Sequence, residues 1–535
     1  MQTTLYYFVI PAIAYLLVII PLRIWKRRSA IRKIRGPPRP SFLLGHEYLL
    51  RSRHHIGDLE MEWYEQYGAV YRTSECFGQH ILSVADPKAL QYIFRSSGYR
   101  YPRTRDIRRM AEAFMGQGVA GVEGSDHQRQ RRILGPAFAV SQLRLFLNVF
   151  QACAQKLTEK TNEYVGEGKE INVLQWTNKA ALDIIGITSF RYEFNALDDG
   201  QTELMVALNN IFGEAQMWPT KRELLFMALW RILPEWVLFL LERLPSRAAV
   251  RLKRFRDIAT NASWPVFEKQ LIEIANDPDP SEKDIVNVLA MSHLATDAKK
   301  KMSDKEINSQ LGTFVLAAID TTAGAISWLL YELSRHPEDQ MKLREEIAIA
   351  KSKASAALTW DDYDGMAWLN AVIKETLRYH PGASVFFHEA SQDDVLPLAE
   401  RIITSDGEPC SEIPISKGQV ISASVLPTVW GDDAAEWNPC RFLDDRGNKR
   451  ESLGTYANLM TFGAGVRGCL GWRFAVMQMQ SVVTELLSNF EFSLPKGAPE
   501  LRHCPAGGAL IPVVTGKANE GPQVPLCVTP INKQV

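Results

Sequence analysis

One stretch near the C-terminus surrounds a cysteine with small residues: Phe462-Gly463-Ala464-Gly465-Val466-Arg467-Gly468-Cys469-Leu470-Gly471. The glycines let the backbone turn tightly and let a bulky group approach it. Arg467 stands two residues before the cysteine, and an apolar helix is predicted to begin near Trp472. A nearby cation and a helix N-terminus both favour the anionic form of Cys469. A single soft thiolate suits iron, and it is one of the axial ligands by which proteins hold haem.

Two other interpretations of this stretch compete. Cys469 can be a small buried core residue, as free cysteines usually are. The pattern Gly463-x-Gly465-x-x-Gly468 also fits the glycine spacing of a dinucleotide-binding loop. Too few residues follow Gly463 to build both halves of a doubly wound nucleotide domain, which argues against that loop. The pattern Phe-x-x-Gly-x-Arg-x-Cys-x-Gly is longer and therefore more specific.

Five of these residues match the haem-binding signature of the cytochrome P450 family position by position: Phe462, Gly465, Arg467, Cys469 and Gly471. The chain resembles that family over nearly its whole length, because further motifs follow in the family's order. The resemblance implies a mainly α-helical fold with small β-sheets and a catalytic domain over residues 41–535. It also implies that haem b (iron protoporphyrin IX) is bound by the Cys469 thiolate, with Phe462 and Arg467 in the cofactor-binding loop.

A long helix is expected from about Asp304 to Arg335, with an acid and two threonines inside an apolar run at its centre. A threonine hydroxyl can bond to the carbonyl one turn earlier and open a groove in the helix. The run resembles the family's oxygen-activation motif, which implies that Asp320 and Thr321 deliver protons. Ala318 replaces the family's usual glycine, so we expect a shallower kink. Taken alone, Thr321 would be interpreted as a core threonine.

Two histidines occupy positions where the family usually has haem-propionate ligands. His127 replaces the tryptophan of Trp-x-x-x-Arg, Arg131 keeps the arginine, and His388 replaces another arginine. The resemblance implies that all three contact propionates, and an imidazole N–H can donate to a carboxylate. If these imidazoles are charged near neutral pH, haem retention should weaken as the pH rises through their pKa. A solvated basic helix face at 127–131 and a neutral exchange at 388 are the alternatives.

Glu375-Thr376-Leu377-Arg378 places an acid and a base three residues apart, on one face of a predicted helix. The resemblance implies that this pair is buried and structural, with Arg441 as its third member. A surface pair of this kind would be worth about 0–1 kcal/mol. Breaking a buried pair would cost about 3–5 kcal/mol, because it leaves a charge without its partner.

The N-terminus is predicted to anchor the protein in a membrane. Residues 5–22 are almost wholly apolar, and at about 1.5 Å per residue they are just long enough to cross a bilayer. Basic residues follow directly, which predicts that the rest of the chain stays in the cytosol. A cleaved signal peptide would carry such charge in front of its apolar run. We therefore expect a transmembrane helix over 1–22, a basic and proline-rich linker over 23–40, and a single pass through the endoplasmic reticulum membrane.

Composition excludes several other classes of protein. The 535 residues carry a formal net charge of zero, which gives no support for nucleic-acid binding. The seven cysteines are scattered and form no CxxC pair, so neither a zinc site nor a disulfide framework is predicted. A sparse, odd number of cysteines is typical of a reducing compartment.

The resemblance implies a haem-thiolate monooxygenase that inserts one oxygen atom from O2 into a lipophilic small molecule, such as a terpenoid or another secondary metabolite. Residues 205–255 are rich in apolar and aromatic side chains. In the family they form a lid over the substrate entrance; ordinary core is the alternative. Electrons would come from a separate NADPH–cytochrome P450 reductase, with cytochrome b5 as a second possible donor. A reductase-independent isomerase or dehydratase and a non-catalytic haem-binding protein are the other candidates, and the retained Asp320 and Thr321 argue against both.

Overall fold

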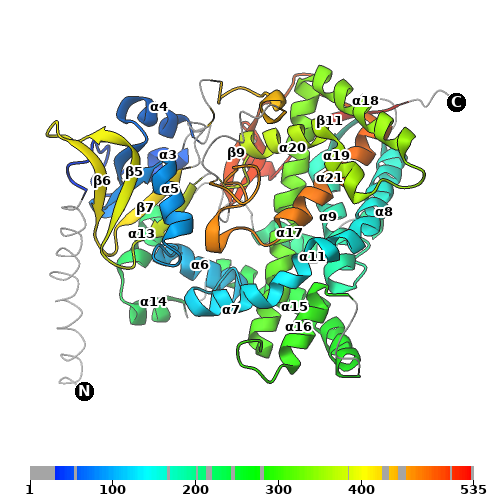
Figure 1. The fold of residues 1–535 in the computed structure, drawn as a ribbon, viewed down its shortest axis with the longest axis horizontal. Helices are drawn as coiled ribbons and strands as arrows, with labels where there is room; N and C mark the ends of the chain where they lie inside the picture. Colours follow the sequence, from blue (N-terminus) through cyan, green and yellow to red (C-terminus); the bar gives the residue numbers. More distant parts are fainter. Residues whose placement is uncertain are drawn as a thin grey trace.

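The computed structural model describes residues 31–52, 57–165, 169–199, 203–211, 220–242, 247–276, 282–383, 385–424, 430, 433–443, 453–506 and 509–531. Most of these residues are helical, and the largest sheet lies at one side of the molecule beside α3, α4 and α5 (Figure 1). This agrees with the mainly helical fold with small sheets that the sequence predicts. The predicted transmembrane helix over 1–22 lies outside the described residues.

The helices of the described residues are α3 (Glu47–Ser52), α4 (Asp58–Tyr67), α5 (Pro87–Gln91), α6 (Arg105–Met115), α7 (Gly124–Leu134), α8 (Val140–Tyr164), α9 (Val173–Phe190), α10 (Ala196–Asp199), α11 (Glu203–Ile211), α13 (Lys221–Ile232), α14 (Glu235–Glu242), α15 (Arg247–Asn276), α16 (Ile285–Leu294), α17 (Asp304–Arg335), α18 (Pro337–Lys353), α19 (Trp360–Gly365), α20 (Ala367–Tyr379) and α21 (Trp472–Asn489). Two short turns matter for the site, the π-helical turn η3 (Tyr92–Ser96) and the 3-10 turn η8 (Gly465–Arg467).

The strands form four small sheets. The largest has the order β1 (Val70–Ser74), β2 (His80–Val84), β7 (Val420–Ser424) and β4 (Val385–Glu389). The others pair β3 (Lys169–Asn172), β11 (Pro525–Pro530) and β8 (Phe490–Ser493); β5 (Asp394–Ile403) and β6 (Pro409–Ile415); and β9 (Leu501–Ala506) and β10 (Ala509–Val514). The β2–β7 pair is parallel, and every other pair in these sheets is antiparallel.

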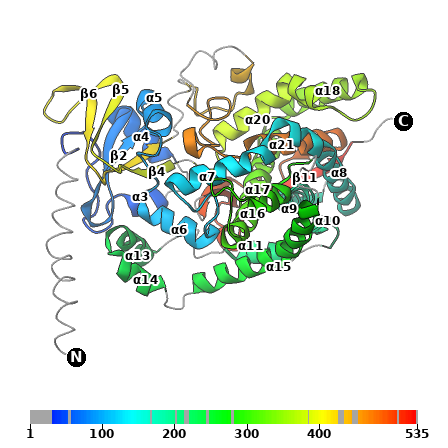
Figure 2. The same ribbon diagram turned by 60° about the horizontal axis from the view of Figure 1, so that its bottom comes forward.

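Helix α17 runs through the middle of the molecule and packs against α9, α15 and α21 (Figures 1 and 2). A capping box starts it, because the Ser303 hydroxyl accepts from Glu306 N and the Glu306 carboxylate accepts from Ser303 N. Among the described residues, α17 is the helix that is long and apolar enough to cross a membrane. Its most apolar window is 72% buried inside the protein, which is the behaviour of a core helix.

The last part of the predicted linker packs on the catalytic domain. Ile31 and Ile34 are buried in the same apolar cluster as β2 and β7. The carbonyl of Arg35 accepts from Arg72 N at 2.8 Å. The backbones approach so closely that a Cβ on Gly36 would lie 2.0 Å from the Arg72 carbonyl oxygen. Residues 31–36 are therefore part of the folded domain, and the domain begins before residue 41.

The predicted lid region contains α11, α13, α14 and the start of α15, while residues 212–219 and 243–246 lie outside the described residues. Helix α13 is fixed by Arg231, whose buried guanidinium pairs with carboxylates of Glu47, Glu75 and Asp106. These carboxylates belong to α3, to the residue that follows β1 and to α6, so one side chain ties α13 to all three. Phe226 and Trp236 remain about half exposed, whereas Leu224 and Leu238 are buried, so this region has both core and surface apolar residues.

Candidate functional site

The loop around Cys469 is held by its own backbone. Cys469 N donates to the carbonyl of Phe462 at 2.7 Å, and Gly463 N donates to that of Met460 at 2.6 Å. Gly463 and Gly465 have φ values of 64° and 61°, in the left-handed region that glycine adopts without strain. The loop leads directly into α21, which begins at Trp472. The cysteine therefore stands just before a helix N-terminus, as the sequence predicts.

The thiol of Cys469 is enclosed by protein atoms and yet accessible. Burial raises its pKa, while the Gly471 N–H and the charge of Arg131 act in the opposite direction. The residue as a whole is nevertheless exposed. A thiol that coordinates a metal gives up its proton, so this side chain can supply the single soft ligand that the sequence predicts.

Arg467 does not flank the thiol in the way the sequence suggested. Its guanidinium donates to the Val122 carbonyl at 2.7 Å and pairs with the Glu123 carboxylate. The cation beside Cys469 is Arg131, which donates to the Gly468 carbonyl at 2.6 Å. The sequence placed Arg467 near the thiol from spacing alone, whereas the side chain turns toward a carboxylate that is distant in sequence.

One face of α17 also borders open space. Ala317 and Thr321 are exposed although they lie in the middle of a largely buried helix. The Thr321 hydroxyl donates to the Ala317 carbonyl one turn earlier at 2.7 Å, which is the bond that the sequence predicted. The helix continues without interruption through Ala318. Burial raises the pKa of the neighbouring Asp320 to about 6, so its carboxyl can carry a proton close to neutral pH.

His127 is oriented to donate a hydrogen bond. It is buried on α7, and its Nδ1 lies 2.8 Å from the hydroxyl of Tyr99. If Tyr99 donates to Nδ1, the neutral imidazole carries its proton on Nε2 and can donate it to a carboxylate. In that arrangement the tyrosine selects the tautomer that a propionate would need.

His388 has the opposite tautomer. Its Nδ1 lies 2.8 Å from the backbone carbonyl of Tyr101, which can only accept, so the proton is on Nδ1. The remaining nitrogen of the neutral ring is an acceptor. His388 therefore cannot donate to a propionate in the way that the family's arginine does at this position.

Arg103 brings a guanidinium to the place where that arginine is missing. It forms an isolated antiparallel β-bridge with His388. Its Nε donates to Glu123 at 3.0 Å, and its buried Nη2 has no hydrogen-bond partner among the described residues. No motif in the sequence singles out Tyr99, Arg103 or Glu123, because no local pattern indicates a contact with a strand nearly three hundred residues away.

We call Arg103, Arg131 and Arg467 the arginine cluster. All three act electrostatically on His127, and the carboxylate that pairs with two of them is Glu123. The three arginines and Glu123 together have a net charge of +2. Buried charges in proteins are normally paired, and haem b carries two propionate groups. The charge of the cluster, the free Arg103 Nη2 and the exposed thiol therefore fit a haem.

The two imidazoles are neutral at physiological pH. Burial, assisted by the arginine cluster, lowers the pKa of His127 to about 3. Burial lowers the pKa of His388 to about 4, against the hydrogen bond to the Tyr101 carbonyl. Because the unfolded chain then binds more protons between about pH 3 and 6.5, these groups make folding less favourable as the pH falls through that window. This reverses the pH dependence that the sequence suggested.

We therefore expect haem content and the urea midpoint to be flat from about pH 7 to 9, and the midpoint to fall below about pH 6.5. Pyridine-haemochrome assays and urea titrations across pH would measure both. A His127→Asn/His388→Asn protein is the control, and its midpoint should depend less on pH between 5 and 6.5. Loss of haem between pH 7 and 9 that this control abolishes would contradict neutral histidines.

Glu375 lies at the centre of the predicted buried network. Its carboxylate is inaccessible and pairs with Arg378 Nε at 2.7 Å and with Arg441 Nε at 3.1 Å. It also accepts from Asn438 N at 2.7 Å. The pair is thus buried, and Arg441 is its third member, as the resemblance implies. The network joins α20 to the segment that precedes the Cys469 loop.

A family model named Cytochrome P450 matches residues 35–518. The chain belongs to the cytochrome P450 family. It is 32% identical to cytochrome P450 monooxygenase 81 of Postia placenta over 502 residues, which cover 90% of each chain. It is 28% identical to cytochrome P450 monooxygenase claQ of Ampulloclitocybe clavipes, with 94% of each chain covered. It is 30% identical to the ganoderic acid synthetase of Ganoderma lucidum, over 87% of this chain and 89% of the relative.

Membership of this family establishes the cofactor and the broad activity. Cytochrome P450s use a haem with a thiolate ligand, and the named relatives are monooxygenases of fungi. The P450 described here is therefore a haem-thiolate oxidoreductase.

Proposed function

We propose that Cys469 is the axial ligand of the haem and that the arginine cluster, with His127, binds the two propionates. The observation that carries this proposal is that Cys469 is accessible and lies beside Arg131, a member of the arginine cluster. With Glu123, this cluster has a net charge of +2. Phe462 shapes the loop by accepting from Cys469 N. His388 contributes to this site by holding Arg103 in place through the β-bridge. It does not donate a hydrogen bond to a propionate.

When bound, the haem supplies the activation of O2 and the oxidation of the substrate. The chain supplies orientation, exclusion of water and protons. The Thr321 hydroxyl donates its hydrogen bond to the Ala317 carbonyl, so its oxygen remains able to accept a hydrogen bond from a group on the exposed face of α17. Asp320 is adjacent, and its raised pKa of about 6 makes it a proton donor near neutral pH. The pair can thus carry protons inward along α17.

Replacing Asp320 with Asn should lower product formation by about a hundredfold or more, because a positioned general acid contributes about a hundredfold to ten-thousandfold. The haem content and the reduced-CO spectrum should stay unchanged, since Asn keeps the shape of the side chain. NADPH would be consumed without product, and hydrogen peroxide release measures that loss. The matched control is Thr322→Ser, a buried neighbour on α17. If the Asp320→Asn enzyme still formed one product for each NADPH consumed, the proton-delivery role would be contradicted.

The substrate is proposed to be a lipophilic small molecule, such as a terpenoid or another secondary metabolite. Apolar residues with partial exposure stand on the elements around the site, among them Phe114, Ala318 and Phe386. One relative is named for ganoderic acid. Electrons are proposed to come from an NADPH–cytochrome P450 reductase, with cytochrome b5 as a second donor.

We further propose that the protein lies on the endoplasmic reticulum membrane with its catalytic domain in the cytosol. Large apolar side chains are exposed on α3, α13, α14 and the segment before α3, and α13 contacts α3. They are Phe42, Leu43, Tyr48, Phe226, Met227 and Trp236. Lys221 lies 4.8 Å above the Tyr48 ring and Arg39 4.8 Å above the Phe42 ring. Aromatic residues with adjacent cations suit the headgroup region of a bilayer.

The deciding experiment compares metabolites by mass spectrometry. Cells carry a reductase with either the intact protein or Cys469→Ala and are fed terpenoid and aromatic candidates. A product heavier by one oxygen, formed only with the intact protein, supports the monooxygenase. A product of unchanged mass, or one that has lost water, formed without the reductase, would instead support the isomerase or dehydratase.

A further inference from the structure

Glu123 is the acidic member of the haem-binding surface. It stands between α6 and α7, and each carboxylate oxygen meets a different arginine. Arg103 Nε donates to Oε1 at 3.0 Å, and Arg467 Nη2 pairs with Oε2. About one fifth of each of these three side chains is exposed. A carboxylate in this position is unexpected, because it competes with the propionates for the same donors.

The charge of the site explains why a carboxylate is useful there. With Glu123 the arginine cluster carries two net positive charges, which two propionates balance. Without it the cluster would carry three. One-electron reduction adds a negative charge to the haem, so a surplus positive charge nearby would favour the reduced form. A negative charge in the same place opposes reduction.

We propose that Glu123 sets the net charge of the arginine cluster and thereby keeps the reduction potential of the haem low. The proposal rests on the proposed binding of the propionates by this cluster. Glu123 acts through Arg103 and Arg467 and is therefore a positioning residue, with no contact to substrate required.

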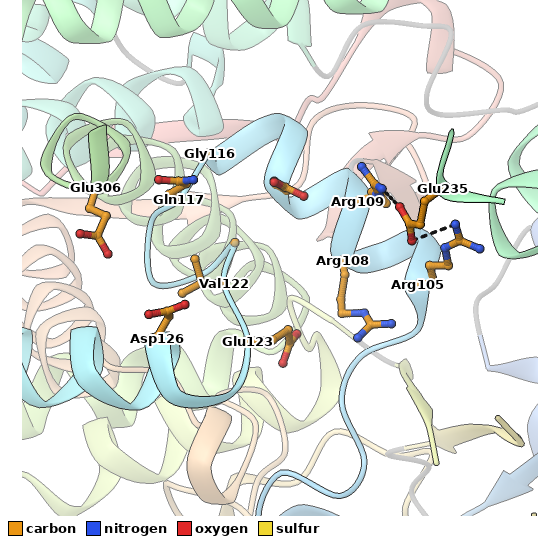
Figure 3. Close-up of a pocket in the computed structure, with 12 residues that line it drawn as sticks. Arg105, Arg108, Arg109, Gly116, Gln117, Val122, Glu123, Asp126, Glu235 and Glu306 are labelled. Carbon is orange, nitrogen blue, oxygen red and sulfur yellow. Dashed lines mark ion pairs between the residues drawn. The ribbon is translucent and has the colours of Figure 1, made fainter. Parts of the chain in front are cut away.

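Glu123 also borders a cavity of about 560 Å³ lined largely by charged side chains of α6, α7 and α17. Figure 3 shows Glu123 and Asp126 on its α7 side, with Arg105 and Arg109 meeting Glu235 across it. The cavity gives water access to the outer side of the Glu123 carboxylate. Solvation from that side offsets part of the cost of placing a carboxylate at the edge of a buried site.

Four proteins test the proposal: wild type, Glu123→Gln, Arg103→Gln and the double variant. Spectroelectrochemical titration measures the midpoint potential of each. Glu123→Gln should raise it and Arg103→Gln should lower it. The double variant, which restores two net charges, should return close to wild type. Each single change should alter the ferrous-to-ferric ratio at a fixed applied potential by about threefold to tenfold, and tenfold corresponds to about 59 mV for one electron.

Haem transfer to apomyoglobin provides a second readout. Glu123→Gln should release haem no faster than wild type, because it leaves the arginines free to bind propionates. Arg103→Gln should release it faster. Asp126→Asn is the matched control, since Asp126 lines the same cavity but pairs with Arg129. It should change neither the potential nor the rate.

An unchanged or lowered potential in Glu123→Gln would overturn the proposal. So would a double variant that keeps the potential of Glu123→Gln, because charge balance would then not be the cause. Faster haem release from Glu123→Gln would show that the carboxylate merely holds the arginines in place. The assignment of Cys469 as the axial ligand is tested separately. It would be refuted if Cys469→Ser kept the reduced-CO spectrum of a thiolate-bound haem.

Discussion

Gly465→Ala should leave the protein largely without haem and destabilise it by about 2–5 kcal/mol. A Cβ at this position would lie 1.7 Å from the carbonyl oxygen of Phe94 in η3. The positive φ of 61° adds about 1–2 kcal/mol for any residue with a Cβ, and relieving an overpacked contact costs about 1–3 kcal/mol. The clash would move either η3 or the loop that presents Cys469. Pyridine-haemochrome content and urea unfolding measure both effects.

Gly463→Ala separates the two costs. Gly463 has almost the same φ, but a Cβ there would meet its nearest atom at 3.7 Å, which is ordinary contact. The Gly463→Ala protein should lose about 1–2 kcal/mol of unfolding free energy and keep most of its haem. Equal losses in the two variants would mean that the backbone conformation, and not the approach of Phe94, makes glycine necessary at 465.

Glu375→Gln should cost about 3–5 kcal/mol of unfolding free energy. Gln keeps the shape of the side chain but removes the charge, which leaves Arg378 and Arg441 buried beside a neutral amide. Arg378 would lose most, because only 3% of its side chain is exposed and its other partners are the carbonyls of Ala434 and Glu436. Urea unfolding of the haem-loaded protein is the measurement.

The control for this variant is Asp361→Asn. Asp361 pairs with Arg144 at 2.9 Å, and both side chains are more than half exposed. Such a surface pair is worth about 0–1 kcal/mol, so the midpoint should barely change. A loss below about 1 kcal/mol in Glu375→Gln as well would mean that solvent reaches the network and screens it.

The elements nearest the chemistry could be predicted because their signals are local. The glycines and Cys469 share one short loop, Thr321 bonds within its own helix, and Glu375 and Arg378 are one turn apart. Each of these relations spans only a few residues. Periodicity, turn chemistry and a family pattern were sufficient to find them.

The charges around the proposed haem site could not be predicted, because they depend on contacts between distant segments. Arg103 reaches His388 through a bridge between a loop and a strand, and Glu123 pairs with Arg467 beside the Cys469 loop. The same contacts decide that His388 is neutral and is an acceptor at its free nitrogen. The sequence reveals that the family's arginine is missing at position 388, but only the fold reveals that Arg103 lies beside that position.

The packing of Ile31 and Ile34 on the domain would limit the distance between the enzyme and a membrane if the proposed N-terminal anchor is inserted in one. If the anchor ends at residue 22, only residues 23–30 are left to connect it to a segment that is already folded. Eight residues span at most about 28 Å even when fully extended. The domain would then be held close to the bilayer surface, and its freedom to rotate would be small. A substrate dissolved in lipid would meet an entrance whose orientation is set by this short connection.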